Sequence, residues 1–220
     1  MAFEVTWYAQ SAFRIEVDGL RIYHDPFRIP DGEPIADVIL ISHDHFDHCS
    51  PPDIAKIRDP RKTFVVANPT AASANELAPP VQVIRPGGEL TYEKLHIRAV
   101  PAYNLNKFRS PGVPYHPREL EHVGYLCQVG GVTWYFAGDT DAIPEMAEFG
   151  PVEYAFLPVS GTYVMTAEEA AEAVRMLRPR VVIPMHYGAV VGSVEDAKRL
   201  AQLVGNLAEV RILEPRGRKA

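Results

Sequence analysis

One short segment of this sequence concentrates side chains that bind metal ions. The six residues HDHFDH, at positions 43–48, contain three histidines and two aspartates. Ionisable groups packed this closely would repel one another or need solvent, so folding alone gives no reason for them. Imidazole and carboxylate are ligands that suit zinc, and they also bind manganese or iron. The segment therefore predicts a metal site.

Two distant residues are expected to join this segment. The apolar runs VILIS, VTWYFAG and VVIPM lead directly into His43, Asp139 and His186. Ligand crevices in α/β proteins open at the carboxyl ends of strands. Gly138 allows the backbone to turn and to bring Asp139 close. We therefore expect all three side chains to meet at one edge of the structure.

The elements that must position these residues alternate between strands and helices in both halves of the chain. Apolar runs separated by Asp18-Gly19 and by Gly130-Gly131 predict hairpins. Thr166 and Glu169 have the spacing of a capping box and predict the start of a helix. This pattern favours an α/β fold in which two mixed sheets pack face to face with helices outside, as a single domain over residues 1–220.

Composition narrows the kinds of partner. The formal net charge is -6 and there is no block of lysine and arginine, so a nucleic-acid surface is not expected. The N-terminus lacks the pattern of a signal peptide, and no apolar run is long enough for a bilayer. Cys49 and Cys127 are expected to be reduced core residues. We expect a cytoplasmic enzyme that acts on a small molecule; a homo-oligomer is compatible with the sequence.

The HDHFDH segment matches the H-x-H-x-D-H signature, and the sequence thereby resembles the metallo-β-lactamase fold superfamily. The resemblance extends through GDTD at 138–141 and PMHYG at 184–188. It is strongest to the small cytoplasmic metal-dependent hydrolases near ascorbate-6-phosphate lactonase. The resemblance implies a four-layer αββα sandwich with the site at the rim between the two sheets.

The resemblance also implies a ligand set for one or two zinc ions. Asp139 would bridge two metal positions, the first held by His43 and His45 and the second by Asp47, His48 and His186. The signature leaves Asp44 free, and Phe46 is expected to serve packing.

The sequence departs from the family pattern in two places. The first metal position normally takes a third histidine after a middle strand, but Asn104 stands there. Asn104 itself or His116 could substitute, whereas His122 is expected to lie at the surface. Gln10 stands where this branch often has a histidine in the first hairpin.

The segment YHDPF leaves a further histidine in doubt. His24 ends an expected strand and either approaches the site or is structural. Asp25 is expected only to shape the turn that follows.

The chemistry implied is hydrolysis of a small ester, lactone or phosphodiester by a metal-bound hydroxide. Asp47 and Asp139 are the expected catalytic residues, and Asp47 could orient the water or carry a proton. The long segment 104–121 contains Lys107 and Arg109, which would contact an anionic substrate.

Two tyrosines are further candidates for substrate binding. Tyr163 lies in a loop after a strand, and Tyr187 follows His186. For Tyr187, packing is the preferred interpretation.

Two other classes of function stay open. One is an oxidoreductase with a single iron held by two histidines and one aspartate. The other is a binding or regulatory protein whose first metal position has degenerated at Asn104.

Overall fold

The first of two large sheets comes from the N-terminal third of the chain. The computed structural model describes residues 2–73 and 77–216. The sheet has the strand order β1 (Phe3–Ala9), β2 (Ala12–Val17), β3 (Leu20–His24), β4 (Val38–Ile41), β5 (Phe64–Ala67) and β6 (Gln82–Val83). The pairs β1/β2 and β2/β3 are antiparallel, and the strands from β3 to β6 run parallel.

The second sheet is also mixed. Its order is β15 (Glu209–Val210), β14 (Val181–Met185), β13 (Tyr154–Pro158), β12 (Val132–Phe136), β11 (Val123–Val129), β8 (Leu95–Pro101) and β7 (Glu89–Tyr92). The strands from β12 to β15 are parallel, whereas β7, β8, β11 and β12 pair antiparallel. Both sheets therefore have parallel strands whose carboxyl ends can present ligands.

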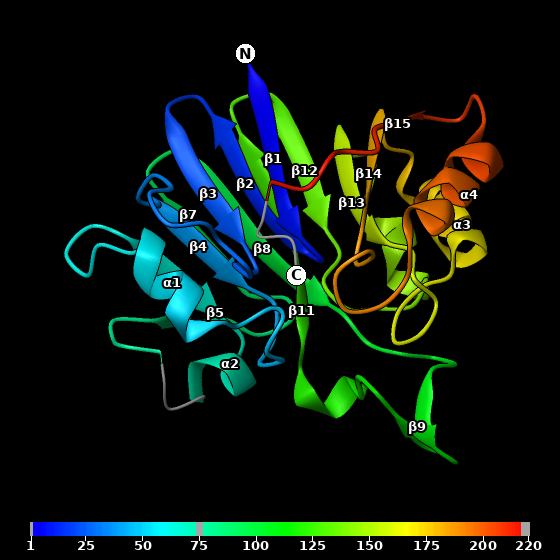
Figure 1. Ribbon diagram of the computed structural model, residues 1–220, viewed down its shortest axis with the longest axis horizontal. Helices are drawn as coiled ribbons and strands as arrows, with labels where there is room; N and C mark the ends of the chain where they lie inside the picture. Colours follow the sequence, from blue (N-terminus) through cyan, green and yellow to red (C-terminus); the bar gives the residue numbers. More distant parts are fainter. Residues whose placement is uncertain (1, 74–76, 217–220) are drawn as a thin grey trace.

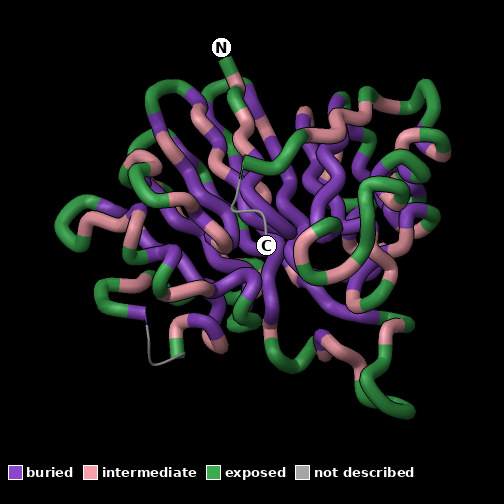
Figure 2. The backbone as a smooth tube through the Cα atoms, viewed as in Figure 1, coloured by how far each residue is buried: buried purple, intermediate pink, exposed green. Residues whose placement is uncertain are grey.

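Helices cover the outer face of each sheet, which confirms the predicted αββα layers (Figure 1). The helices are α1 (Pro51–Ile57) and α2 (Pro69–Ser73) beside the first sheet, and α3 (Ala167–Leu177) and α4 (Val194–Val204) beside the second. The main core lies between the sheets, where the Phe13 and Phe156 rings meet edge to face at 4.9 Å. A smaller core, with Ile39 and Ile54, lies under α1 and α2. The central strands are accordingly almost continuously buried (Figure 2).

Local sequence explains where the two longer helices begin. Thr166 and Glu169 form the predicted capping box at α3, with the Thr166 hydroxyl accepting from the Glu169 N–H. Ser193 and Asp196 form a second capping box at α4. Each box satisfies backbone N–H groups that have no partner within the helix.

The segment 104–121 is more regular than the loop that the sequence predicts. It contains the hairpin β9 (Phe108–Ser110) and β10 (Val113–Pro114), followed by the 3₁₀ helix η1 (Arg118–Leu120). The hairpin projects from the body of the protein (Figure 1). A second 3₁₀ helix, η2 (Pro144–Glu148), precedes β13.

The two sheets approach closely beside the expected site. Gly138 has φ +63, and a Cβ there would lie 2.8 Å from the Val123 carbonyl oxygen and 3.1 Å from the Ser42 Cβ. Only glycine fits this position without displacing the backbone. Both cysteine side chains are buried, as predicted. Within the described ranges, no helix has the length and apolar character needed to cross a bilayer.

Candidate metal centre

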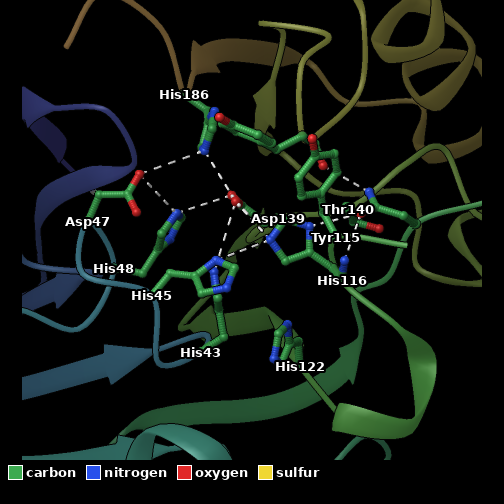
Figure 3. Close-up of polar contacts among 12 residues, drawn as sticks. His43, His45, Asp47, His48, Tyr115, His116, His122, Asp139, Thr140 and His186 are labelled. Carbon is green, nitrogen blue, oxygen red and sulfur yellow. Dashed lines mark hydrogen bonds and ion pairs between the residues drawn. The ribbon is translucent and has the colours of Figure 1, made fainter. Parts of the chain in front are cut away.

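Seven side chains form two adjacent groups at the carboxyl ends of β4, β12 and β14 (Figure 3). Within each group the ligand atoms lie within 4.8 Å of one another; the first group is His43, His45, His116 and Asp139, and the second is Asp47, His48 and His186. The structure thus brings together all six residues named as metal ligands from the sequence, and with them His116, which the sequence offers as a possible substitute ligand.

Asp139 lies between the two groups. Its Oδ2 is 3.3 Å from the Nε2 of His116 and 3.2 Å from that of His186, while its Oδ1 is 3.2 Å from the Nε2 of His48. Two ligands on one tetrahedral ion, each about 2.0–2.1 Å from it, would be separated by about this much. The carboxylate is therefore placed to serve both positions.

Orphaned polar atoms show that the residues fit a metal. The Nε2 of His43 is buried and makes no hydrogen bond, and the buried His48 Nε2 and Asp139 Oδ1 lie 3.2 Å apart without forming one. Leaving a buried polar atom unpaired costs about 1–3 kcal/mol. All three face the centre of the cluster (Figure 3). A cation at this centre would satisfy them together.

His116, and not Asn104, lies where it could supply the third imidazole of the first position. The Asn104 Oδ1 accepts hydrogen bonds from the backbone N–H and from the ring Nδ1 of His116, both at 2.9 Å. The amide Nδ2 donates to Asp141 and to the Tyr163 carbonyl. Because the Asn104 oxygen is already bonded to His116, the geometry favours His116 over Asn104 of the two possible substitutes. A proton on Nδ1 leaves the His116 Nε2 lone pair free for a metal.

Asp25 orients two ligands of the cluster at once. Its Oδ2 lies 2.7 Å from the Nδ1 of His48 and accepts from the Ser42 hydroxyl at 2.6 Å. That hydroxyl in turn lies 2.9 Å from the Nδ1 of His43. The sequence analysis assigned Asp25 only to a turn. Asp25 directly follows β3, which pairs with β4, and this position was the signal in the sequence that it could reach the ligands after β4.

His186 is held in a conformation that side chains rarely adopt. Its φ is +60°, and its backbone N–H donates to the Gln10 carbonyl at 2.9 Å. Its Nδ1 lies 3.1 Å from the Ser160 hydroxyl and 3.2 Å from the Gln10 amide. Such strain persists where surrounding contacts enforce it. Gln10, which replaces the histidine of the branch, is therefore a buried support for His186.

Two other histidines, His24 and His122, are buried, and neither belongs to the two ligand groups. His24 is structural: its Nε2 accepts from the Trp134 indole at 3.1 Å, and its ring stacks on Phe136. His122 is 2% exposed and stacks on His43 with ring centroids 4.8 Å apart. The expectation of a surface position for His122 was wrong, because this residue, directly before β11, packs under the His43 ring.

The expected substrate contacts fall into different environments. The Lys107 ammonium pairs with Glu169 at 2.7 Å and with Asp141 at 3.3 Å, so it is committed to carboxylates of the protein itself. Arg109 is exposed and donates to the Tyr115 carbonyl. Tyr163 lines the cavity beside the ligands.

Two aromatic residues of the motif regions differ in their exposure. Tyr187 is buried and packs on Trp7 with centroids 4.8 Å apart, in keeping with a packing role. Phe46, expected to serve packing, is instead 65% exposed.

Burial and charge set the protonation of the cluster. Burial lowers the pKa of His116 to about 3, so this imidazole is neutral and ready to act as a ligand. Burial alone would raise the pKa of Asp139, but His186 and His48 hold it well below its usual range. Burial opposes the charge on His48, yet Asp139, Asp47 and Asp25 raise its pKa well above 6.5. An anionic Asp139 at the centre is what a cation needs.

A family described as "Beta-lactamase superfamily domain" matches residues 4–186, which is most of the chain. The matched range includes all seven candidate ligands and ends at the last of them, His186. The chain belongs to the beta-lactamase superfamily. A relative within it is the UPF0173 metal-dependent hydrolase of Thermococcus kodakarensis, 35% identical over 96% of each chain.

Solved structures of the superfamily agree with this assignment. A protein from Parabacteroides distasonis, described as a metal-dependent hydrolase, is 32% identical with a TM-score of 0.84, over 97% of this chain and 94% of that one. A metallo hydrolase from Ignicoccus hospitalis is 27% identical with a TM-score of 0.76, over 98% and 96% of the two chains. The general activity of this chain is that of a metal-dependent hydrolase.

Proposed function

We propose that the protein hydrolyses a small ester or lactone at a centre of two divalent metal ions, with zinc as the preferred metal. The observation that carries this proposal is the position of Asp139 between two groups of candidate ligands, of which only His45 is not buried. Its carboxylate oxygens lie 3.2–3.3 Å from imidazole nitrogens of both groups. Four ligands on one side and three plus a shared carboxylate on the other suit tetrahedral zinc.

The ligand set also weighs against the two alternative functions. A single-iron oxygenase centre uses two histidines and one carboxylate, whereas seven ligands are gathered here in two groups. The binding or regulatory alternative depended on a missing ligand at Asn104. His116 occupies that role, so this reason for expecting a degenerate site is removed.

The metal ions, when bound, would supply an activated water and polarise the acyl oxygen of the substrate. The protein itself would contribute positioning and proton transfer. Asp47 lines the cavity, and its Oδ2 lies 3.7 Å from the His48 Nε2 and 3.9 Å from the His186 Nε2. From there the Asp47 carboxylate can hold the proton of the attacking water and pass it to the leaving group.

Chelation and restoration would test the proposal. Protein stripped of metal should lose activity on a panel of small esters and lactones, and zinc should restore it at about two ions per chain. Manganese and iron, added to the same apo-protein, rank the metals, and a phosphodiester in the panel tests the other substrate class. Protein that holds two zinc ions but turns over no ester or lactone would refute the proposal.

A further inference from the structure

A small cavity opens beside the metal ligands, and its outer wall is apolar. Its volume is about 250 Å³. The ligands His45, Asp47, His116, Asp139 and His186 form one side, and Phe46, Tyr115, Tyr163 and Val190 form the other. We propose that this outer wall binds an uncharged apolar group, acyl or aryl, next to the bond that is hydrolysed. This inference rests on the proposed function and specifies its substrate class.

The aromatic part of the wall is built from three separate segments. The rings of Tyr115 and Tyr163 meet edge to face with centroids 4.7 Å apart. Phe46 comes from the metal-binding segment itself, and its ring meets that of Phe27 at 5.8 Å. Phe46 remains 65% exposed, although the next residue, the ligand Asp47, is only 7% exposed. Together with Val190, which is 39% exposed, Phe46 forms an exposed apolar patch at the cavity, and such a patch beside a functional centre indicates contact with a ligand.

The nearby cations do not face this cavity. None of its lining residues, all of which the structure describes, is a lysine or an arginine. The Lys107 ammonium is held by Glu169 and Asp141, and the Arg109 guanidinium donates to a backbone carbonyl. The Arg28 guanidinium lies over the ring of Phe27, 5.2 Å from its centroid. A carboxylate or phosphate on the substrate would therefore meet no cationic side chain in this wall, and only the Tyr115 and Tyr163 hydroxyls could donate to it, so that its desolvation would cost binding free energy.

The volume limits the size of the group. Pockets for drug-sized ligands span about 300–1,000 Å³, and this cavity lies below that range. A short acyl chain or a single aromatic ring is the scale that fits. The sequence predicts an anionic substrate, whereas this cavity favours a substrate whose group at the wall is uncharged.

A matched pair of metal-chelating probes tests the wall without turnover. Butanohydroxamic acid and succinic monohydroxamic acid have chains of equal length, but only the second ends in a carboxylate. Calorimetry on the zinc-loaded protein should show about tenfold or more tighter binding of the butano compound, because the carboxylate loses water beside a wall that offers no cationic partner.

A cation placed in the wall should reverse this preference. Val190→Lys adds an ammonium beside the cavity and should shift the ratio of the two affinities about tenfold or more toward the succinic probe. Val194→Lys is the matched control: both valines are exposed, at 39% and 43%, but Val194 begins α4 and does not line the cavity. This control should keep the wild-type ratio.

The outcomes separate the two proposals. Equal or tighter binding of the succinic probe by the wild type overturns the apolar wall, as does a Val190→Lys effect that is the same for both probes. Failure of both probes to bind the zinc-loaded protein also overturns it. If the probe preferences hold while no ester or lactone is turned over, the wall stands and the proposed hydrolysis fails.

Discussion

The side-chain oxygen of Asn104 holds His116 by two hydrogen bonds, from the backbone N–H and from the ring Nδ1, each at 2.9 Å. This pairing fixes the imidazole so that its Nε2 faces Asp139 at 3.3 Å. Asn104 therefore acts on the metal through His116. The residue that interrupts the family pattern in the sequence is the one that orients its replacement.

Asn104→Ala should weaken metal binding at the first position about 10–100-fold, the usual effect of losing a partner that orients a ligand. Competition with a chromophoric chelator would give the two affinities separately, and the second should change little. Asn104→His should also weaken binding, because an imidazole cannot reproduce both bonds to His116. Tighter binding by Asn104→His would mean that residue 104 is itself a ligand position. Asn106→Ala is the control, since the Asn106 amide contacts Glu169 and not the cluster.

Replacing the shared ligand Asp139, or the ligand His186 of the second group, should abolish hydrolysis. Asp139→Asn and His186→Ala should each lower kcat/KM for a neutral ester by about 100-fold or more, because Asp139 serves both metal positions and His186 belongs to the second. Metal analysis should show fewer ions per chain, while circular dichroism shows a folded protein. Asp44→Asn, in the free position of the motif, should retain turnover. Near-normal turnover by Asp139→Asn would contradict the proposed centre.

Asp25→Asn should reduce metal affinity at both positions. Asp25 accepts directly from the Ser42 hydroxyl and pairs with the His48 ring, and Ser42 contacts His43. An amide cannot accept all of these bonds, so we expect a loss of about 10–100-fold in affinity. The same chelator competition measures it. A loss confined to one position would show that only one of the two histidines depends on Asp25.

Lys107→Met should lower kcat/KM by the same factor for neutral and for anionic substrates. Its ammonium joins the start of the 104–121 segment to Glu169 on α3 and to Asp141, which in turn accepts from Asn104. Loosening this contact should lower kcat/KM about tenfold for matched neutral and anionic esters equally. Arg109→Ala, on the exposed hairpin, should alter neither. A larger loss for the anionic ester would restore Lys107 as a substrate contact.

Acid should destabilise the fold through His24. Burial lowers the pKa of His24 to about 3 in the folded protein, against 6.5 for the free side chain. Below pH 6.5 the unfolded chain therefore binds a proton that the folded protein does not, so the free energy of unfolding falls as pH falls toward 3. The part lost between pH 7 and 5 is about 2 kcal/mol.

Urea unfolding of His24→Gln at the two pH values measures this loss. Glutamine keeps an acceptor for the Trp134 indole but does not titrate, so the variant should be less sensitive to pH than the wild type by about 2 kcal/mol. His96→Gln, on the exposed face of β8, is the control. An unchanged pH sensitivity in His24→Gln would show that His24 is not the source.

The layered fold and most ligands could be predicted because their signals are local. Alternation of apolar runs and capping residues such as Thr166 describes each element from its own residues. His43, Asp139 and His186 each follow an apolar run, and parallel strands bring such ends to one edge. The spacing within HDHFDH places His45, Asp47 and His48 in the same short loop as His43.

The parts that only the tertiary structure decided involve contacts between distant segments. His116 becomes a candidate ligand because the 104–121 segment doubles back, so that His116 bonds to Asn104 and faces Asp139, and Asp25 reaches His48 across 23 positions of sequence. Lys107 carries a charge that the sequence assigns to a substrate, but a buried Asp141 and Glu169 on α3 neutralise it. Spacing along a chain determines which residues share an element. Which side chains satisfy one another depends on how loops pack, because a polar group takes whichever partner burial leaves within reach.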